Sequence, residues 1–211
     1  MRKLALIFGV TAGLLAGASS ASATTLCNEA ANPCPEGRRY NMGTTIKMAQ
    51  KAKVKLEMGG LGNLECNKSN LEGATTANSG NPLTGEASSF TLKECDLNGV
   101  RCANDPAGVG TNWVMNVEWG AVVGNGTWKL KKHLGGVDPG FSVNCQVGGV
   151  IVNCTFSKVE WILTTTGGNP AILSMVKAVM NRAGLACPAN AELTVEYEVT
   201  EPKPLFISKE P

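Results

Sequence analysis

Histidine is nearly absent from this sequence, in which His133 is the only one among 211 residues. Nucleophilic devices of the Ser-His-Asp and Cys-His kinds need an imidazole that accepts a proton near neutral pH. His133 follows Lys131 and Lys132 and stands just before a Gly-Gly pair, where we interpret it as a solvated residue at a strand end. The sequence therefore argues against this catalysis, and we expect no catalytic residue and no cofactor.

Net charge and long apolar runs are also lacking. Arg2 and Lys3 account for two of the 19 basic residues, and the rest of the chain balances 17 basic against 17 acidic residues. A neutral chain without a basic run lacks the electrostatic footprint of a protein that binds nucleic acid or an anionic membrane. After residue 23, no segment approaches the roughly 18 consecutive apolar residues of a spanning helix. We therefore expect neither nucleic acid as a partner nor a membrane span.

Residues 1–23 have the features of a cleavable signal peptide. Arg2 and Lys3 supply a positive start, Leu4–Leu15 is mostly apolar, and Ala21–Ala23 offers the small side chains that a signal peptidase accepts. This pattern predicts cleavage after Ala23, which leaves 188 residues. No cysteine stands where a lipoprotein signal would need one, so we expect a soluble secreted, extracellular product.

The eight cysteines all lie beyond this leader. An even number of cysteines in an exported chain is typical of disulfides, and the absence of a Cys-x-x-Cys motif argues against a zinc site or another metal site. A turn at Gly148-Gly149 would bring the two cysteines that flank it opposite one another, and a short loop with Pro33 could be closed by its own pair. The pairs we predict are Cys27–Cys34, Cys66–Cys95, Cys145–Cys154 and, as the remaining pair, Cys102–Cys187.

Alternation of apolar and polar residues indicates strands along most of the chain. Lys51–Met58, Trp113–Trp119 and Ala191–Val199 alternate, and glycine, asparagine and proline separate such runs. Many short strands of this kind are typical of a sandwich or barrel. We predict an all-β, antiparallel, sandwich-like domain with disulfides over residues 24–205, followed by a C-terminal tail at 206–211.

Two hairpins are expected within this domain. Asn125-Gly126, a pair that tolerates positive φ, would form a tight turn after Trp113–Trp119. Phe141–Cys145 and Val150–Phe156 would form the second hairpin.

Residues 170–182 fit two structures. Pro170 in the first turn and Gly184 beyond the end favour one short helix, and a strand is left open because apolar residues also alternate there with Lys177. The apolar residues at helical spacing are Ile172, Met175, Val176, Val179 and Met180.

The chain contains, in order, Leu64-Glu-Cys66, Leu71-Glu-Gly73, Leu83-Thr-Gly85, the Cys145–Cys154 hairpin, Gly167–Ala171 and the ending Tyr197–Leu205. Taken together, these motifs resemble a family of uncharacterised secreted β-rich proteins from soil actinobacteria. The resemblance covers most of the chain beyond the leader. It implies a sandwich-like extracellular domain and a strand at 171–183, and it transfers no activity and no functional residue.

Paired carboxylates and tryptophans are the remaining candidates for chemistry. Glu118 and Glu160 each precede a tryptophan, which is the kind of neighbourhood in which a glycosidase could act on a stacked sugar. However, glutamate that alternates with apolar residues is what any wet strand face shows, and this interpretation is favoured for both. Core packing explains the tryptophans better than a binding platform does, although a platform is the alternative for Trp113, Trp119, Trp128 and Trp161.

The sequence also offers a candidate calcium loop and candidate glycosylation sites. Asp96, Asn98, Asn104 and Asp105 offer oxygen ligands within one stretch, but such residues are also ordinary in turns. The sequons at Asn67, Asn125 and Asn153 are interpreted as chance matches in a bacterial protein.

The sequence therefore favours a secreted, non-enzymatic binding or structural module whose ligand is a cell-envelope polymer, a protein or an apolar small molecule. The alternative is a secreted polysaccharide hydrolase that uses Glu118 and Glu160 as its carboxylate pair. The sequence specifies neither the ligand nor the oligomeric state.

Overall fold

The computed structural model describes residues 22–102, 106–108, 112–147, 149–183 and 187–211. Within these ranges the chain is all-β, as predicted, with no α-helix and one short 3-10 turn at Gly59–Leu61. The strands are β1 (Thr24–Cys27), β2 (Thr45–Gln50), β3 (Val54–Glu57), β4 (Asn63–Thr75), β5 (Ser79–Gly80), β6 (Leu83–Leu97), β7 (Val100–Arg101), β8 (Ala107–Gly108), β9 (Trp113–Trp119), β10 (Gly126–Lys131), β11 (Gly140–Val147), β12 (Val150–Ser157), β13 (Glu160–Thr166), β14 (Ile172–Ala183), β15 (Asn190–Glu201) and β16 (Phe206–Lys209).

The large sheet is antiparallel and closes on itself. Starting from β2, neighbouring strands pair in the order β2-β4-β6-β9-β10-β13-β14-β15, and β15 pairs again with β2. We call this circuit the first ring. A sheet closed in this way buries one face of every strand, which is why the strands alternate between buried and wet side chains.

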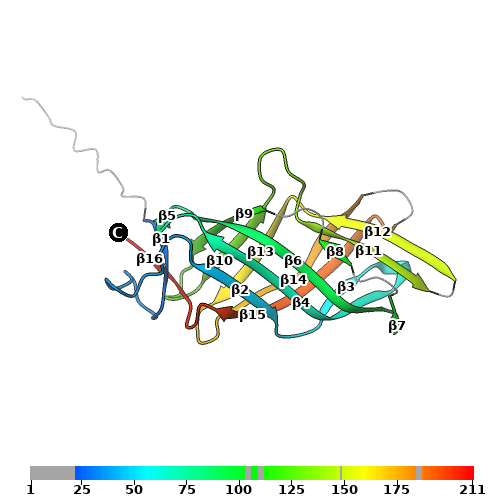
Figure 1. The fold of residues 1–211 in the computed structure, drawn as a ribbon, viewed down its shortest axis with the longest axis horizontal. Coiled ribbons are helices and arrows are strands. Elements are labelled where there is room, and N and C mark those ends of the chain that lie inside the picture. The colour runs from blue at the N-terminus through cyan, green and yellow to red at the C-terminus, as the bar shows by residue number, and fades with distance from the viewer. Residues whose placement is uncertain (1–21, 103–105, 109–111, 148, 184–186) are drawn as a thin grey trace, which may run out of the picture.

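A second ring shares the long strands with the first. The circuit β3-β4-β6-β8-β11-β12-β14-β15 also closes, because β8 pairs with both β6 and β11, β12 pairs with β14, and β15 pairs with β3. The strands β4, β6, β14 and β15 therefore run through both rings. Figure 1 shows them running obliquely along the long axis, with the β11–β12 hairpin at one end of the molecule.

The first and last strands, β1 and β16, form a separate three-stranded sheet with β5 at the opposite end, in the order β16-β1-β5 (Figure 1). All four residues of β1 are buried, and Thr24 pairs with both Lys209 and Gly80. Residues 206–209, expected to belong to a tail, are instead a strand paired with β1. The alternation rule misses this strand because Phe206–Lys209 is only four residues long and follows a proline-rich segment.

Aromatic side chains fill the interior of the first ring. Trp113, Trp128 and Trp161 are almost fully buried, and the rings of Phe90 and Trp161 meet edge to face with centroids 5.1 Å apart. Trp113 lies 5.4 Å from Trp161 by the same measure. These rings come from β6, β9, β10 and β13, so their packing joins neighbouring walls of the ring.

The four disulfides correct half of the predicted pairing. Cys27–Cys34 and Cys66–Cys95 form as predicted, but Cys102 bonds Cys145, and Cys154 bonds Cys187. The β11–β12 ladder explains the difference, because Val147 faces Val150 across the turn. This register sets Cys145 opposite Val152 and Cys154 opposite Val143, so the two cysteines of the hairpin are offset and bond outside it.

Residues 172–183 are strand β14, so the helix favoured for residues 170–182 is wrong. The strand contains a bulge: Met175 pairs with Val195 and Ala178 with Leu193, so β14 has one residue more than β15 across this interval. The extra residue breaks the two-residue alternation. The resulting spacing of apolar side chains imitates a helix.

Two further expectations need correction. The run Lys51–Met58 is a strand only over Val54–Glu57, because the chain passes from the first ring to the second between β2 and β3. Asn125-Gly126 is not a tight turn: Gly126 already pairs with Trp119, and the loop comprises residues 120–125. A Cβ on Gly126 would lie 2.2 Å from the Glu118 carbonyl oxygen, so this position needs glycine for close approach of two backbones.

Candidate binding groove between β13 and β14

The wall of the closed sheet opens between β13 and β14. The β13–β14 ladder ends at the pair Thr164–Ser174, and the β12–β14 ladder begins at the pair Ser157–Asn181. The number of residues from Ser157 to Thr164 equals the number from Ser174 to Asn181. A single register could therefore pair β14 with the chain from β12 to β13 without a break. Residues 158–163 and 175–180, all of them described, nevertheless lack a ladder partner across this gap.

Irregular backbone on both sides accounts for the opening. On one side the chain bends at Lys158-Val159, where it leaves β12 of the second ring and enters β13 of the first. On the other side lies the β14 bulge, where Lys177 has a φ of 49°. The Lys177 N–H donates a hydrogen bond to Thr194 Oγ1 over 3.1 Å, towards β15 and away from β13. The β13–β14 ladder therefore does not continue between these two irregularities.

Four large aliphatic side chains on the rims are exposed. Val176 is 71% exposed, Val179 46%, Ile162 44% and Val159 66%. In the register that the flanking ladders share, Ile162 would face Val176, and Val159 would face Val179. Ile162, Val176 and Val179 line one cavity, and Val159 is exposed at the bend that precedes β13. Exposed apolar side chains that gather in this way are typical of interaction surfaces.

The cavity between the rims has a volume of about 490 Å³ and is lined by residues from both strands. We call it the β13–β14 groove; its lining includes Lys158, Ile162, Thr164, Ser174, Val176 and Val179. Thr164 Oγ1 and Ser174 Oγ lie 3.1 Å apart and close one end of the groove. The groove is thus apolar along its rims and polar at that end.

The charged side chains that line the groove are both lysines. Lys158 makes no ion pair within the described part of the chain, and Lys177 lies 3.7 Å from Glu192 in an exposed pair. Glu160 is on the same strand as Ile162, but its carboxylate is bound by Lys131 on β10 at 2.9 Å, on the side away from β14. The groove therefore combines aliphatic rims with positive charge.

The carboxylates considered for glycoside hydrolysis do not come together. Glu118 lies opposite Thr127 and Glu160 opposite Lys131, on the two sides of β10. Four residues along the strand and two strand spacings across it place them about 16 Å apart. Glycosidase pairs are about 5 to 9.5 Å apart. Glu118 is also held by Lys129 at 2.7 Å, so the geometry does not support this pair as a hydrolytic centre.

The tryptophans offer little surface to a ligand. Trp113, Trp128 and Trp161 lie in the core, where an external ligand cannot stack on them. Trp119 is partly exposed, but the Lys209 ammonium group covers its ring at 4.6 Å from the centroid. Burial thus favours the packing interpretation of these four residues.

The remaining candidates are structural or exposed side chains. His133 is exposed in the loop before β11. The Asn98 carboxamide accepts from the Asn63 N–H and donates to the Leu61 carbonyl, both over 2.9 Å, and Asp96 faces Arg101 at 3.8 Å. Asn104 and Asp105 lie outside the described residues. Among the residues that the structure describes, no three metal-binding side chains form a group that could hold an ion.

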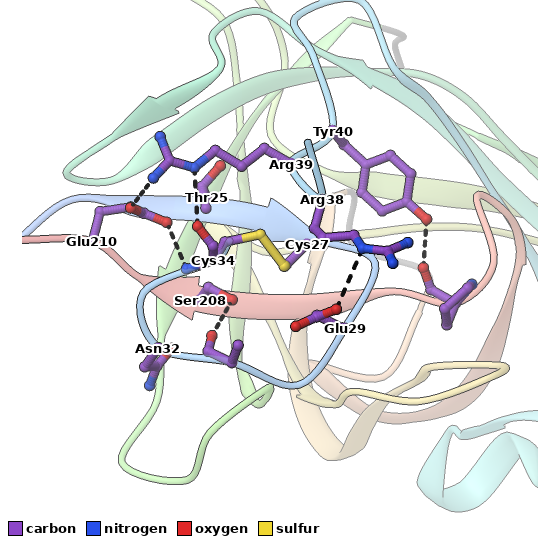
Figure 2. Close-up of a disulfide and its surroundings, with 12 residues drawn as sticks. Thr25, Cys27, Glu29, Asn32, Cys34, Arg38, Arg39, Tyr40, Ser208 and Glu210 are labelled. Atoms are coloured by element: carbon purple, nitrogen blue, oxygen red, sulfur yellow. Dashed lines mark hydrogen bonds and ion pairs between the residues drawn. A yellow bond between two sulfur atoms is a disulfide. The ribbon is translucent and has the colours of Figure 1, made fainter. Parts of the chain in front are cut away.

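The chain ends carry a second polar cluster, which we call the terminal clasp, made of Cys27, Cys34, Arg39 and Glu210 (Figure 2). The Glu210 carboxylate, 6% exposed, accepts a 3.1 Å hydrogen bond from the Cys34 N–H and is paired with Arg39 at 2.6 Å. The Cys27–Cys34 disulfide closes the loop that ends at Cys34, and an isolated β-bridge joins Arg39 to Cys27. The clasp thereby fastens the C-terminal residues against β1. Sequence reasoning missed the contacts of Glu210 because this residue lies 176 residues from Cys34 and 171 residues from Arg39.

No family model, curated protein or solved structure matches this chain. Within the described residues, no helix is long and apolar enough to cross a membrane. The four disulfides are typical of a protein that folds in an oxidising environment.

Proposed function

We propose that this protein is a secreted, non-enzymatic binding module that holds its partner in the β13–β14 groove. The observation that carries the proposal is the group of exposed aliphatic side chains, Ile162, Val176 and Val179, that line an opened wall of the sheet. A rigid, closed and disulfide-bonded scaffold supports it, because a preformed site loses little conformational entropy on binding.

The leader pattern and the disulfides support secretion as part of this proposal. A chain exported through the leader at residues 1–23 would form its four disulfides outside the cytosol. The resemblance to secreted actinobacterial proteins is in keeping with the same location. A hydrolytic function has less support, because Glu118 and Glu160 are each neutralised by a lysine and lie far apart.

Arrays of cell-envelope polysaccharides, lipids and peptides test the proposal. We expect the purified protein to bind at least one ligand on these arrays. The variant Val176→Asp should bind that ligand at least tenfold more weakly, because it places a charge among the aliphatic side chains. Val122→Asp is the matched control: Val122 is 63% exposed but lies in the β9–β10 loop. Absence of any ligand, equal binding by both variants, or release of hydrolysis products would overturn the proposal.

A further inference from the structure

The rims of the β13–β14 groove are two strand edges that face each other. Residues 158–163 and 175–180 have no ladder partner across the gap. On their other sides, residues 160–163 pair with β10, and residues 175 and 178–180 pair with β15. The Lys158 N–H donates to the Pro139 carbonyl instead. Backbone N–H and C=O groups along an unpaired strand edge are a template for another extended chain. A polypeptide segment can use this edge, whereas an aliphatic ligand without amides cannot.

The side chains of the groove restrict the sequence of such a segment. Ile162, Val176 and their neighbours on the rims offer aliphatic contact, which favours apolar side chains on the bound segment. Lys158 and Lys177 line the groove, and none of the residues that line it is acidic. Two carboxylates on the strands of the wall are already paired, Glu192 with Lys177 and Glu160 with Lys131. Charge complementarity therefore favours a segment that carries carboxylates.

We infer that the β13–β14 groove binds an extended polypeptide segment with alternating aliphatic and acidic residues, which adds to the sheet as a strand. This inference rests on the proposed binding function and names the class of ligand. Main-chain hydrogen bonds to a rim supply affinity, and the aliphatic pairs together with Lys158 select the side chains. The alternative occupant, an anionic amphiphile, would use the same lysine and aliphatic groups but not the strand edge.

The first experiment measures peptide binding to the purified wild-type protein by calorimetry, with backbone chemical shifts to locate the site. The probe is an eight-residue peptide of alternating valine and glutamate. The controls are the same peptide with lysine in place of glutamate, the same peptide N-methylated at alternate residues, and dodecanoate. N-methylation removes the N–H donors from one edge without changing the charge or side chains.

We expect the acidic peptide to bind with shifts centred on residues 158–164 and 174–179, and the lysine and N-methylated peptides to bind at least tenfold more weakly. Equal binding of the N-methylated peptide would rule out strand addition. Shifts confined to another surface, or binding of dodecanoate alone, would also overturn the inference. Because the protein is unaltered here, misfolding cannot explain a negative result.

The second experiment tests the lysine. Lys158→Glu should lower the affinity for the acidic peptide at least tenfold. The control is Lys203→Glu, which should leave the affinity unchanged, because Lys203 is exposed and has no ion pair among the described residues. Equal effects of the two variants would refute the role of Lys158. If the arrays yield a ligand sensitive to Val176→Asp while no peptide binds, the proposed function stands and the strand-addition inference fails. If nothing binds in either experiment, both fail.

Discussion

Tyr197 offers a sharp test of the closed sheet, because its hydroxyl lies inside it. Tyr197 on β15 is fully buried, and its hydroxyl lies 2.7 Å from Ser69 Oγ on β4, a strand separated from β15 by β2. Burial raises the pKa of Tyr197 well above the ordinary tyrosine value of 10.0, and the hydrogen bond from Ser69 opposes this only in part. The folded state therefore keeps this phenol protonated at alkaline pH.

The sign of the pH dependence follows from proton binding. Below pH 10.0, the ordinary tyrosine value, both states hold the proton, so the free energy of unfolding does not depend on this group. Above it, the unfolded chain releases the proton while the folded chain retains it. The free energy of unfolding should then fall by about 1.4 kcal/mol per pH unit until the raised pKa of the folded state is reached.

Tyr197→Phe removes this titration. At pH 7 the variant should lose about 1 to 3 kcal/mol, because the buried Ser69 hydroxyl keeps no partner. Between pH 10 and 11.5 the deficit should shrink by about 2 kcal/mol, because only the wild type retains the Tyr197 penalty. Urea unfolding followed by tryptophan fluorescence measures both quantities, and the wild-type-minus-variant difference cancels the titration of Tyr40 and the lysines.

Ser69→Ala and the double variant complete the cycle. Removal of both hydroxyls should cost less than the sum of the single changes, with a coupling of about 1 to 2 kcal/mol. Parallel loss of stability by wild type and Tyr197→Phe above pH 10 would show that Tyr197 titrates in the folded protein. That result would refute its placement inside a closed sheet.

Two further predictions concern the chain crosslinks and the terminal clasp. Replacing Cys102 and Cys145 by serine should lower the free energy of unfolding by about 4 kcal/mol, because this bond closes a 43-residue separation. Removing the bond of the seven-residue Cys27–Cys34 loop should lower it by only about 2 kcal/mol. Chemical denaturation measures both losses, and the reverse order would contradict the prediction. Glu210→Ala should lower the free energy of unfolding by about 2 kcal/mol. Glu210→Gln should lower it less, because the amide oxygen still accepts a hydrogen bond from the Cys34 N–H. Equal losses of stability in thermal unfolding would show that this hydrogen bond contributes nothing.

Strands with regular alternation could be predicted from the sequence because their whole length lies on one wall. Trp113–Trp119 is strand β9 with the predicted bounds, and Ala191–Val199 lies within β15. In both strands every second side chain points into the same core, so the alternation of apolar and polar residues can be recognised from the local sequence alone. The all-β class follows from many such segments.

Features that depend on register or on distant partners could not be predicted. The disulfide partner of Cys145 depends on the register of the β11–β12 hairpin. The structure pairs Val147 with Val150, whereas a turn shifted by one residue would set Cys145 opposite Cys154, and the sequence allows either. The clasp joins Arg39 and Glu210 across nearly the whole chain. No periodic pattern marks such an encounter.

The groove was hidden from sequence reasoning for a different reason, since it exists because two rings of strands share one wall. The β14 bulge exposes Val176 and Val179, and the bend at Lys158-Val159 turns the opposite rim away. Leaving four aliphatic side chains about half exposed forgoes roughly 3 to 7 kcal/mol of hydrophobic stabilisation.

The distribution of crosslinks fits such an opening. Three of the four disulfides, Cys66–Cys95, Cys102–Cys145 and Cys154–Cys187, attach to strands of the second ring, in which β8 is only two residues long. The first ring instead has the tryptophan core. Covalent bonds thus stabilise the half of the sheet that short ladders stabilise least, which lets the wall between the halves stay open. A ligand that completes the wall would then stabilise the protein as well as bind to it.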